Sequence, residues 1–489
     1  MNINSTHDYI LLMRRALESQ ILPEVCSEDG RSAAQIVLAI LAELEKREGP
    51  TKPLLSGLIT SGKTLIEEMS NFVNARDIDD LSGLPGGSSV GDLISAHSKI
   101  NDLIARLASR LEELDGDERA DALLRRAAEW EASYYLENSK VPLVFSNDSG
   151  PAEPPQLTEQ HVLGVLSEAK ELGADLAMKD FRPLPGGFGK QTYRALVVDG
   201  AGRETDLIIR KMDPNPIVCQ GGCDLASEYG LLNSLAKTGF PAPQPFLFRA
   251  GYRDVKESFY VTRRVAGVAA GTYLEGSGSS VSASFYEDLA RWLGTLHSYK
   301  LSTFADHIRD YSNPALLSGT ASDAYRYAIE GWKEYLRSSP HLASPLLTWM
   351  ISWLSNNIPY SDLPPVLVHG DYNVHNVLVD QGRLSIVLDW ECAEYGFPEQ
   401  DLAWLKPNLE KVYDWDRFLD IYVAAGGKKE IDSKAMAFSL VYASLRTNIA
   451  GNRATQNLQS GRNRDIRYAM VELGFTGSFM NSALEAGRV

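Results

Sequence analysis

The sequence has few cysteines, no long hydrophobic run and no excess of positive charge, and each absence excludes a class of protein. The four cysteines, Cys26, Cys219, Cys223 and Cys392, lack the paired spacing of a zinc site, so we expect reduced thiols. Residues 1–6 lack the basic and apolar regions of a signal peptide, and no apolar run approaches the roughly 20 residues of a membrane helix. We therefore expect a cytoplasmic protein without a membrane partner.

Acidic residues outnumber basic ones. The chain has 64 Asp and Glu against 48 Lys and Arg, a formal net charge of −16. Such a charge disfavours nucleic acids and anionic lipids, so neither is expected as a partner. With 489 residues, 44% of them hydrophobic and 23% charged, the chain has the composition of a globular protein of two or three domains.

The N-terminal part has the periodicity of α-helices. Between residues 7 and 136, apolar residues recur at helical spacing, beginning with Ile10, Leu11, Met13, Leu17 and Ile21. The Gly and Pro residues at 49–50 and 84–87 are expected to end helices. A polar, proline-rich stretch then follows at 147–156. The sequence thus predicts a small all-α domain over residues 1–146 and a linker over residues 147–156.

One stretch of this part, from Gly57 to Thr64, matches the P-loop pattern G-x-x-x-x-G-K-[ST] in full. A P-loop must follow a buried strand of a parallel sheet. Pro53 lacks the backbone N–H that such a strand needs, and the surrounding periodicity is helical. We therefore interpret the match as coincidence, with Gly62 near the start of a helix and Lys63 without a role in phosphate binding.

Residues 157–266 are rich in β-prone segments. A glycine-rich stretch lies just ahead of an expected strand at 192–198. Glycines between two strands let backbone N–H groups approach phosphate oxygens, because no Cβ stands in the way. The candidate cofactor-binding residues of this stretch are Gly186, Gly187, Phe188, Gly189 and Lys190.

The next expected strand, 206–211, ends in two cations, Arg210 and Lys211. Strand alternation lets only one of them point inward as a clamp for nucleotide phosphates. The alternation leaves open whether Arg210 or Lys211 is that clamp. The amphipathic helix expected at 226–235 offers Glu228 as the partner that would hold this cation.

The most informative motif lies at residues 369–376, where the chain reads His-Gly-Asp-Tyr-Asn-Val-His-Asn. Metal-assisted phosphoryl transfer needs a carboxylate that accepts the proton of the attacking hydroxyl, and oxygen ligands that hold magnesium ions. Asp371 suits the first role. Asn376, together with Asp389 farther along the chain, suits the second. The spaced set predicts a phosphotransferase.

The residues around this motif predict a frame of short strands. Apolar, β-prone runs at 366–368, 376–379 and 384–388 surround a turn at 381–382. The catalytic aspartate and asparagine would then lie on a loop before one strand. Asp389 would follow a second strand that pairs with the first.

From about Leu157 to the last residue, the sequence resembles the aminoglycoside phosphotransferase (APH/choline kinase-like) family of small-molecule kinases. The resemblance implies an α+β fold of the bilobal, protein-kinase-like type, here preceded by the small all-α domain. The β-rich N-lobe would span residues 157–266. The helical C-lobe, with the catalytic and metal-binding loops, would span residues 267–489.

The same resemblance implies a role for each motif residue. Asp371 is the catalytic base, Asn376 and Asp389 are ligands of Mg²⁺, and His369 props the catalytic loop. The phosphoryl donor is ATP or GTP, with Arg210 as the phosphate clamp. Most of the rate gain then comes from positioning and electrostatics.

Three further residues are expected to be structural. Asp401, in a segment similar to the family's G-D-P-x-x-D-L-A pattern, should anchor the catalytic loop by hydrogen bonds. His297 is expected in the core, and His375 as a spacer within the loop, because most lone histidines are not functional.

Three interpretations of the acceptor remain open. A hydroxyacyl-CoA is favoured, because Arg210 with Pro214 and the run 388–391 resemble kinase domains that are joined to acyl-CoA dehydrogenases. The second is an amino sugar, an aminoglycoside or another small alcohol, for which an acidic chain could supply a pocket. The third is a catalytically inactive pseudokinase that serves as a binding module, which the intact Asp371, Asn376 and Asp389 disfavour.

The N-terminal helices look similar to a small companion protein that is encoded beside such kinases, and here the two would be fused. We expect this domain to support the acceptor side of the kinase. Its apolar helix faces would equally suit a homo-oligomer.

Overall fold

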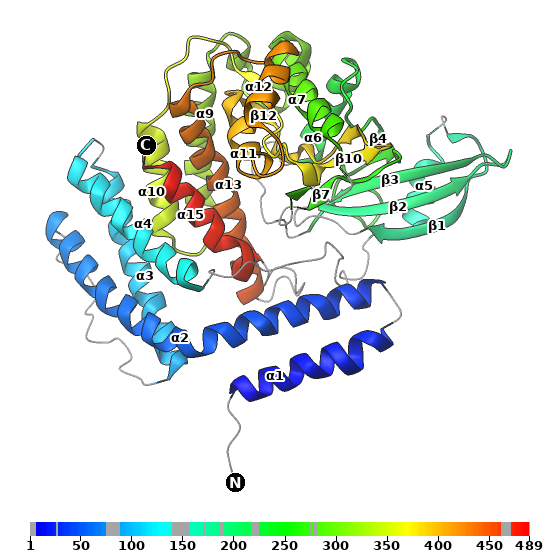
Figure 1. Ribbon diagram of the computed structural model, residues 1–489. Helices are drawn as coiled ribbons and strands as arrows, with labels where there is room; N and C mark the ends of the chain where they lie inside the picture. Colours follow the sequence, from blue (N-terminus) through cyan, green and yellow to red (C-terminus); the bar gives the residue numbers. More distant parts are fainter. Residues whose placement is uncertain are drawn as a thin grey trace. The chain divides into compact units, whose positions relative to one another are not determined.

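The computed structural model describes residues 6–25, 28–74, 89–114, 116–138, 157–169, 172–184, 190–214, 216, 224–272, 276–277, 281–460 and 471–488 (Figure 1). The chain forms two compact units. Unit 1 consists of Met1–Pro151, Trp332–Ile358 and Leu440–Val489, and unit 2 consists of Ala152–Gly331 and Pro359–Ser439. Within the described ranges, no helix is both long enough and apolar enough to span a membrane.

The unit boundaries differ from the domain boundaries expected from the sequence. Residues 332–358 and 440–489, expected in the helical C-lobe, belong to unit 1 with the N-terminal helices. Helices α9 (Ala321–Ser338) and α13 (Ser433–Gln459) run unbroken across these boundaries, so no turn or linker marks them in the sequence. The expected linker at 147–156 lies outside the described residues.

Every described secondary-structure element of unit 1 is helical. Besides the parts of α9 and α13, they are α1 (Thr6–Ala16), η1 (Leu17–Ile21), η2 (Leu22–Glu24), α2 (Glu28–Phe72), α3 (Val90–Glu112), α4 (Glu118–Asn138), α10 (Pro345–Asn356), η10 (Val471–Phe475) and α15 (Thr476–Ala486). The prediction of helices in the N-terminal part is confirmed. Helices α3 and α4 pack against α2 and against α10, and α15 packs on α4.

Helix α2 contradicts the helix break predicted at residues 49–50 and explains the role of Gly62. It continues through Pro50, where the sequence predicts a break, and through Pro53, and it changes direction partway along (Figure 1). The stretch from Gly57 to Thr64 therefore lies in a helix interior rather than near a helix start. A Cβ on Gly62 would meet Ile100 of α3 at 2.6 Å, so this glycine is there for close helix packing. The predicted break at 84–87 lies outside the described residues.

Two side chains of α4 hold the later segments of unit 1. Glu131 accepts hydrogen bonds from the Ser344 hydroxyl at 3.0 Å and from the Leu346 backbone N–H at 2.8 Å, at the start of α10. Arg125 donates to the carbonyl oxygens of Leu484 at 2.9 Å and Gly487 at 2.7 Å, at the end of α15. Backbone groups at helix ends lack hydrogen-bond partners within the helix. Side chains of α4 supply such partners at the start of α10 and at the end of α15.

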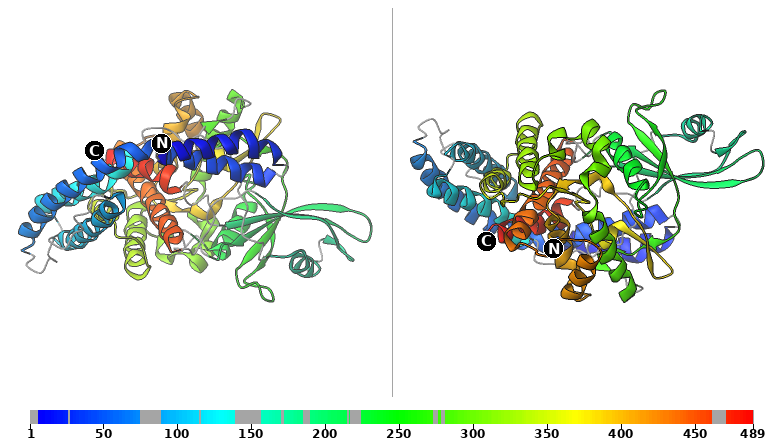
Figure 2. Two further views of the ribbon diagram at one scale, coloured as in Figure 1. Left: turned by 90° about the horizontal axis from the view of Figure 1, so that it is seen from below. Right: turned by 90° about the horizontal axis from the view of Figure 1, so that it is seen from above.

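Unit 2 contains a five-stranded antiparallel sheet in the order β1-β2-β3-β5-β4, and the two views of Figure 2 show its twist. Alternate residues of β2 and β3, such as Tyr193, Ala195 and Leu207, face an apolar core under α5. The predicted β-rich segment is confirmed. Its elements are α5 (Glu159–Leu166), β1 (Ala177–Leu184), β2 (Lys190–Val198), β3 (Glu204–Met212), α6 (Leu225–Ala236), β4 (Pro245–Arg249) and β5 (Phe259–Arg263).

The rest of unit 2 is mainly helical, so the α+β class is confirmed. Leu289, Leu293 and Leu296 of α7 lie at the centre of its core, together with Phe418 and Tyr422 of α12. The helices, besides the part of α9, are α7 (Ala283–Ser298), η6 (Leu301–Phe304), α8 (Ala305–Tyr311), η7 (Pro314–Leu317), α11 (Glu399–Leu409) and α12 (Trp415–Ala424).

Short strands frame the loop that carries the predicted motif. Strands β9 (Val366–Val368), β10 (Val377–Asp380) and β11 (Arg383–Val387) confirm the three predicted runs, and β10 pairs with β11. Gln381 and Gly382 between them have φ of 49° and 78°, as a two-residue hairpin turn requires. The remaining short elements are β6 (Val268–Ala269), β7 (Gly271–Thr272), β8 (Gly276–Ser277), η8 (Val374–Asn376), η9 (Trp390–Cys392) and β12 (Glu394–Gly396).

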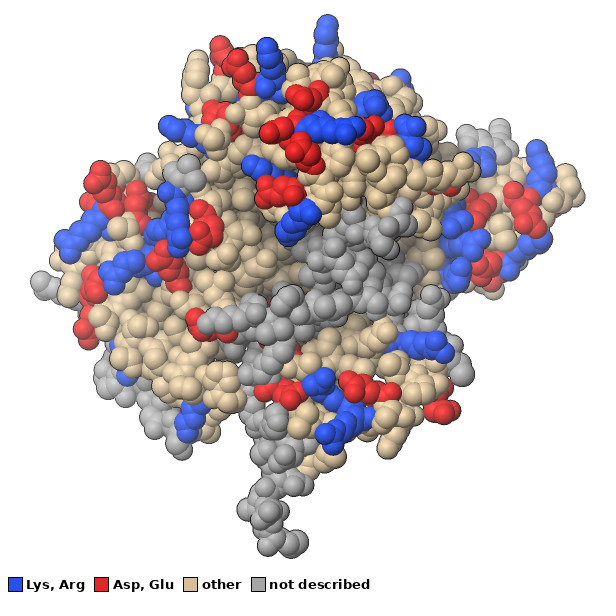
Figure 3. All heavy atoms as spheres, viewed as in Figure 1, with Lys and Arg blue, Asp and Glu red and all other residues tan. Residues whose placement is uncertain are grey.

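Charged side chains of both signs are interspersed on the face drawn in Figure 3. Red and blue groups lie next to one another over the described residues of that face, so the net negative charge is not gathered into one patch there.

Candidate active site

The loop with the predicted catalytic residues begins where β9 ends. The backbone N–H groups of His369 and Gly370 donate to the Asp401 carboxylate at 2.8 and 2.7 Å. Gly370 has a φ of 77°, a conformation that favours glycine. Asp401 is fully buried on α11, and His297 of α7 contacts it at 3.1 Å. These contacts agree with the expectations that Asp401 anchors the loop and that His297 is structural.

His369 joins this loop to the segment that carries Asp389. Its Nδ1 accepts the backbone N–H of Asp371 at 3.2 Å, and its Nε2 lies 2.8 Å from the carbonyl oxygen of Leu388. Both bonds form together when the ring proton is on Nε2. The Leu388 backbone N–H in turn donates to the Asn376 carbonyl oxygen at 2.7 Å. The two candidate metal-binding segments are therefore tied side by side.

The carboxylate of Asp371 is held by three side chains. The indole Nε1 of Trp404, on α11, donates to Asp371 Oδ1 at 2.6 Å. Asp371 Oδ2 accepts from Asn376 Nδ2 at 2.8 Å and lies 3.3 Å from His375 Nε2. The carboxylate cannot rotate without breaking several of these bonds at once.

These donors keep Asp371 ionised. Burial by itself raises the pKa of Asp371, but the charge and hydrogen bond of His375, with smaller contributions from His369 and Trp404, outweigh burial and lower the pKa to about 2. Burial lowers the pKa of His375, and the Asp371 carboxylate reverses that effect and raises it above its ordinary value. The charged forms of both residues stabilise each other.

Asn376 and Asp389 have the donor set that a magnesium ion requires. Both amide hydrogens of Asn376 point to Asp371, to its carbonyl oxygen at 3.0 Å and to Oδ2, so the amide oxygen is left to bind a cation. Asp389 has a φ of 62°, an uncommon conformation for a residue other than glycine, which is typical of functional sites. Mg²⁺ is usually held by one or two protein oxygens together with phosphate oxygens and water, and this pair fits that pattern.

Arg210 and Lys190 surround a buried carboxylate, Glu228. The guanidinium of Arg210 lies 2.8 Å from Asp389 Oδ1 and 3.7 Å from Glu228 Oε1. The ammonium group of Lys190 lies 3.5 Å from Glu228 Oε2 and 2.8 Å from Glu391 Oε2. Burial lowers the pKa of Arg210, but Asp389 and Glu228 outweigh it and raise the pKa well above its ordinary value. Arg210 is therefore a permanent cation next to Asp389.

Lys211 lies apart from this group. Its side chain is fully buried, and its ammonium group contacts Glu257 at 3.2 Å and Gln191 at 3.4 Å. The arrangement favours Arg210 over Lys211 as the phosphate clamp. The other predicted cofactor-binding residues lie outside the described residues; they are Gly186, Gly187, Phe188 and Gly189.

Sequence reasoning missed three contributors to this site. Trp404 is given no role by the sequence interpretation, although it lies three residues after Asp401 and hence on the same helix face. Glu391 was seen only as part of a motif, and its pairing with Lys190 depends on a strand far away in the sequence. His375 was taken for a spacer, but it contacts Asp371.

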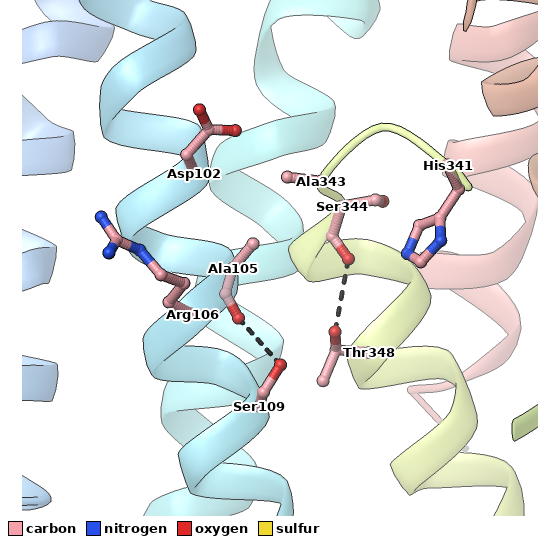
Figure 4. Close-up of a pocket in the computed structure, with 8 residues that line it drawn as sticks. All are labelled: Asp102, Ala105, Arg106, Ser109, His341, Ala343, Ser344 and Thr348. Atoms are coloured by element: carbon pink, nitrogen blue, oxygen red, sulfur yellow. Dashed lines mark hydrogen bonds between the residues drawn. The ribbon is translucent and has the colours of Figure 1, made fainter. Parts of the chain in front are cut away.

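A separate cavity of about 460 Å³ lies within unit 1 and contains none of these residues. Figure 4 shows that it opens between α3 and the start of α10. The hydroxyls of Ser109 and Thr348 bond to backbone carbonyls of their own helices, and that of Ser344 bonds to Glu131. The hydroxyl donors along this wall are therefore already used within the protein.

Comparison with protein families identifies one match. A model described as "Phosphotransferase enzyme family" (APH) matches residues 180–438, more than half of the chain. These residues include the catalytic loop and the cluster around Glu228.

Curated relatives match a similar length of chain. "Acyl-CoA dehydrogenase family member 11" of Rattus norvegicus is 27% identical over 215 residues, which are 43% of this chain and 26% of that protein. The Homo sapiens protein of the same name is 24% identical over 213 residues, again 43% and 26%. The chain thus spans about a quarter of the length of these relatives.

Solved structures of antibiotic phosphotransferases are also similar to this chain. Macrolide 2'-phosphotransferase MphH from Brachybacterium faecium is 17% identical, with a TM-score of 0.41 over 64% of this chain and 98% of that one. Spectinomycin phosphotransferase APH(9)-Ia, in complex with ADP and spectinomycin, is 13% identical, with a TM-score of 0.43 over 68% and 100%.

Proposed function

Since the chain belongs to the APH phosphotransferase enzyme family, we propose that it transfers the γ-phosphoryl group of ATP to a hydroxyl group of a small molecule. The observation that carries this proposal is the convergence of Asp371, Asn376 and Asp389. They lie within one hydrogen-bonded network, next to the Arg210–Glu228 pair.

Asn376 and Asp389 would hold Mg²⁺, which supplies positive charge against the phosphate oxygens when it is bound. Arg210 adds a further positive charge. Its Nε is buried and lies 3.7 Å from Glu228 Oε1. Glu228, held by the Tyr260 hydroxyl at 2.8 Å, keeps the arginine beside Asp389.

Asp371 acts chiefly by orientation. A carboxylate with a pKa of about 2 is a weak base toward an alcohol. In a loose transition state for phosphoryl transfer, little proton transfer is needed before the phosphoryl group has moved. Asp371 therefore accepts a hydrogen bond from the acceptor hydroxyl, aligns its oxygen with the phosphorus, and takes the proton late.

We propose a hydroxyacyl-CoA as the acceptor. The support is the match to relatives named acyl-CoA dehydrogenase family member 11, in which a segment like this one is part of a longer chain. An aminoglycoside or another small alcohol is the alternative.

An acceptor screen tests the proposal. The protein is incubated with Mg-ATP and, in turn, hydroxyacyl-CoAs of varied hydroxyl position, the matching free hydroxy acids, amino sugars and aminoglycosides. ADP release and the phosphorylated product are both measured. We expect turnover with a hydroxyacyl-CoA and a rate at least about 100-fold lower in the Asp371→Asn variant. Turnover with aminoglycosides alone would support the alternative, and nucleotide binding without any phosphorylated product would support a pseudokinase.

A further inference from the structure

Helix α11 contacts the catalytic loop at two points that lie one helical turn apart. Asp401 binds the backbone N–H groups of His369 and Gly370. Trp404, three residues later, binds the side chain of Asp371. One face of α11 thus fixes both the position of the loop's main chain and the rotation of the Asp371 carboxylate.

The contacts of Asp371 leave one direction for an incoming hydroxyl. A carboxylate has about four acceptor positions, two on each oxygen. Asn376 and His375 occupy both positions on Oδ2, and Trp404 occupies one on Oδ1. As far as the described residues are concerned, the remaining acceptor position is on Oδ1, beside the indole.

We propose that Trp404 is a positioning residue of the phosphoryl transfer: its indole N–H holds one side of Asp371 Oδ1, so that the acceptor hydroxyl binds the other side. This proposal rests on the proposed function. The indole N–H is a neutral hydrogen-bond donor that is never an acceptor. It therefore holds the carboxylate in place and cannot itself accept the proton of the hydroxyl. Trp404 is itself partly exposed, as a residue next to an acceptor should be.

Removal of this N–H should lower the rate of transfer more than it weakens nucleotide binding. In Trp404→Phe, Asp371 Oδ1 loses its donor while Oδ2 keeps Asn376 and His375, and the lost bond is one to a charged group. We expect kcat to fall roughly 10- to 100-fold, while KM for ATP changes less than about twofold. Trp332→Phe is the matched control, because it also removes a buried indole N–H, bonded to Tyr442 at 3.3 Å in unit 1, and should leave kcat unchanged.

A second variant separates hydrogen bonding from packing. Trp404→His fills less space than Trp404→Phe but restores a ring N–H. If the N–H matters, the histidine variant has the higher kcat. If Trp404 only fills space, the phenylalanine variant has the higher kcat, and the proposal is overturned.

A measurement without an acceptor tests the contact itself. The Trp404 indole resonance in a ¹H–¹⁵N spectrum is assigned by its loss in Trp404→Phe. It should then move more than any other indole resonance in Asp371→Asn, and a resonance that stays in place would overturn the proposal. If the acceptor screen finds no phosphorylated product, the proposed function fails, but this spectrum still decides whether Trp404 holds Asp371.

Discussion

Asp371 in unit 2 and Glu131 in unit 1 are both carboxylates held by neighbouring donors, and their pKa values move in opposite directions. The side chain of Asp371 is 27% exposed and is held by His375, Asn376 and Trp404, and its pKa falls to about 2. Glu131 is buried and is held by a backbone N–H and a hydroxyl. Burial raises its pKa to about 7, against the opposing effect of these two bonds.

The difference shows that hydrogen bonds alone do not keep a carboxylate charged. Two neutral donors do not offset the burial of Glu131, whereas the charge and hydrogen bond of His375, with smaller contributions from His369 and Trp404, outweigh burial at Asp371. The carboxylate in the catalytic loop stays ionised over the working range of pH. The one that holds α10 titrates near neutrality, so it affects stability rather than catalysis.

The largest expected effect is at Asp371. We predict that Asp371→Asn lowers kcat by about 10²- to 10⁴-fold, because a positioned base is lost in the transition state, while ATP binding is nearly unchanged. Steady-state kinetics and calorimetric titration with Mg-ATP measure the two effects. Asp389→Ala is the contrasting variant and should weaken Mg-ATP binding as well. A variant Asp371→Asn with more than a tenth of the wild-type rate would contradict the assignment.

The next largest effect is a pH dependence of stability that arises from Glu131. Its folded pKa of about 7 lies above the ordinary value of 4.5, so its contribution to stability is fully present below about pH 4.5 and is lost as the pH rises through 7. The loss amounts to about 3 kcal/mol in the free energy of unfolding. Glu131→Gln, which cannot ionise, should flatten this dependence.

Urea unfolding at pH 5 and pH 8 measures this effect. Glu67→Gln, an exposed position on α2, is the matched control and should keep the wild-type dependence. Equal pH dependence in wild type and Glu131→Gln would show that another group is responsible.

A smaller effect is expected at Arg210. We predict that Arg210→Ala raises KM for ATP by about tenfold or more, since a charge-assisted contact to phosphate is lost. Arg210→Lys keeps the charge without the planar fork and should give an intermediate value. An unchanged KM in Arg210→Ala would leave Lys190 as the main phosphate-binding cation.

We expect a substitution of Lys63 to have no effect on activity. It lies in the interior of α2, where no loop of free backbone N–H groups can surround a phosphate. Lys63→Ala should therefore keep both kcat and the affinity for ATP. A large loss of affinity in nucleotide titrations would restore the P-loop interpretation.

The sequence predicted the parts of this site that depend on local order. The strands β9, β10 and β11, the hairpin turn and the anchoring role of Asp401 all follow from short patterns. The pairing of Glu228 with a cation of the neighbouring strand followed from residue type, and the choice of Arg210 as that cation followed from the family resemblance. Such predictions succeed because each residue's neighbours along the chain set its conformation.

The missed features depend on contacts between distant segments. Trp404 reaches Asp371 across 33 residues, and an amphipathic helix gives no sign of which aromatic residue will find a charged partner. The sequence predicts a helix break at Pro50, but packing of the α2 face against α3 and α4 overrides the local preference. The split of α9 and α13 between units likewise follows from packing alone.

The way α4 closes unit 1 has a consequence for how the chain is made. Arg125 and Glu131 leave the ribosome long before α10, and longer still before α15, so the nascent N-terminal helices must wait with their apolar faces uncovered. Release of the last helix completes the unit. A chain that begins at Gln156 lacks α4, and a chain that ends before α15 lacks the helix that packs on α4. Either cut leaves apolar surfaces of unit 1 uncovered, so we expect both shortened chains to depend on chaperones and to aggregate.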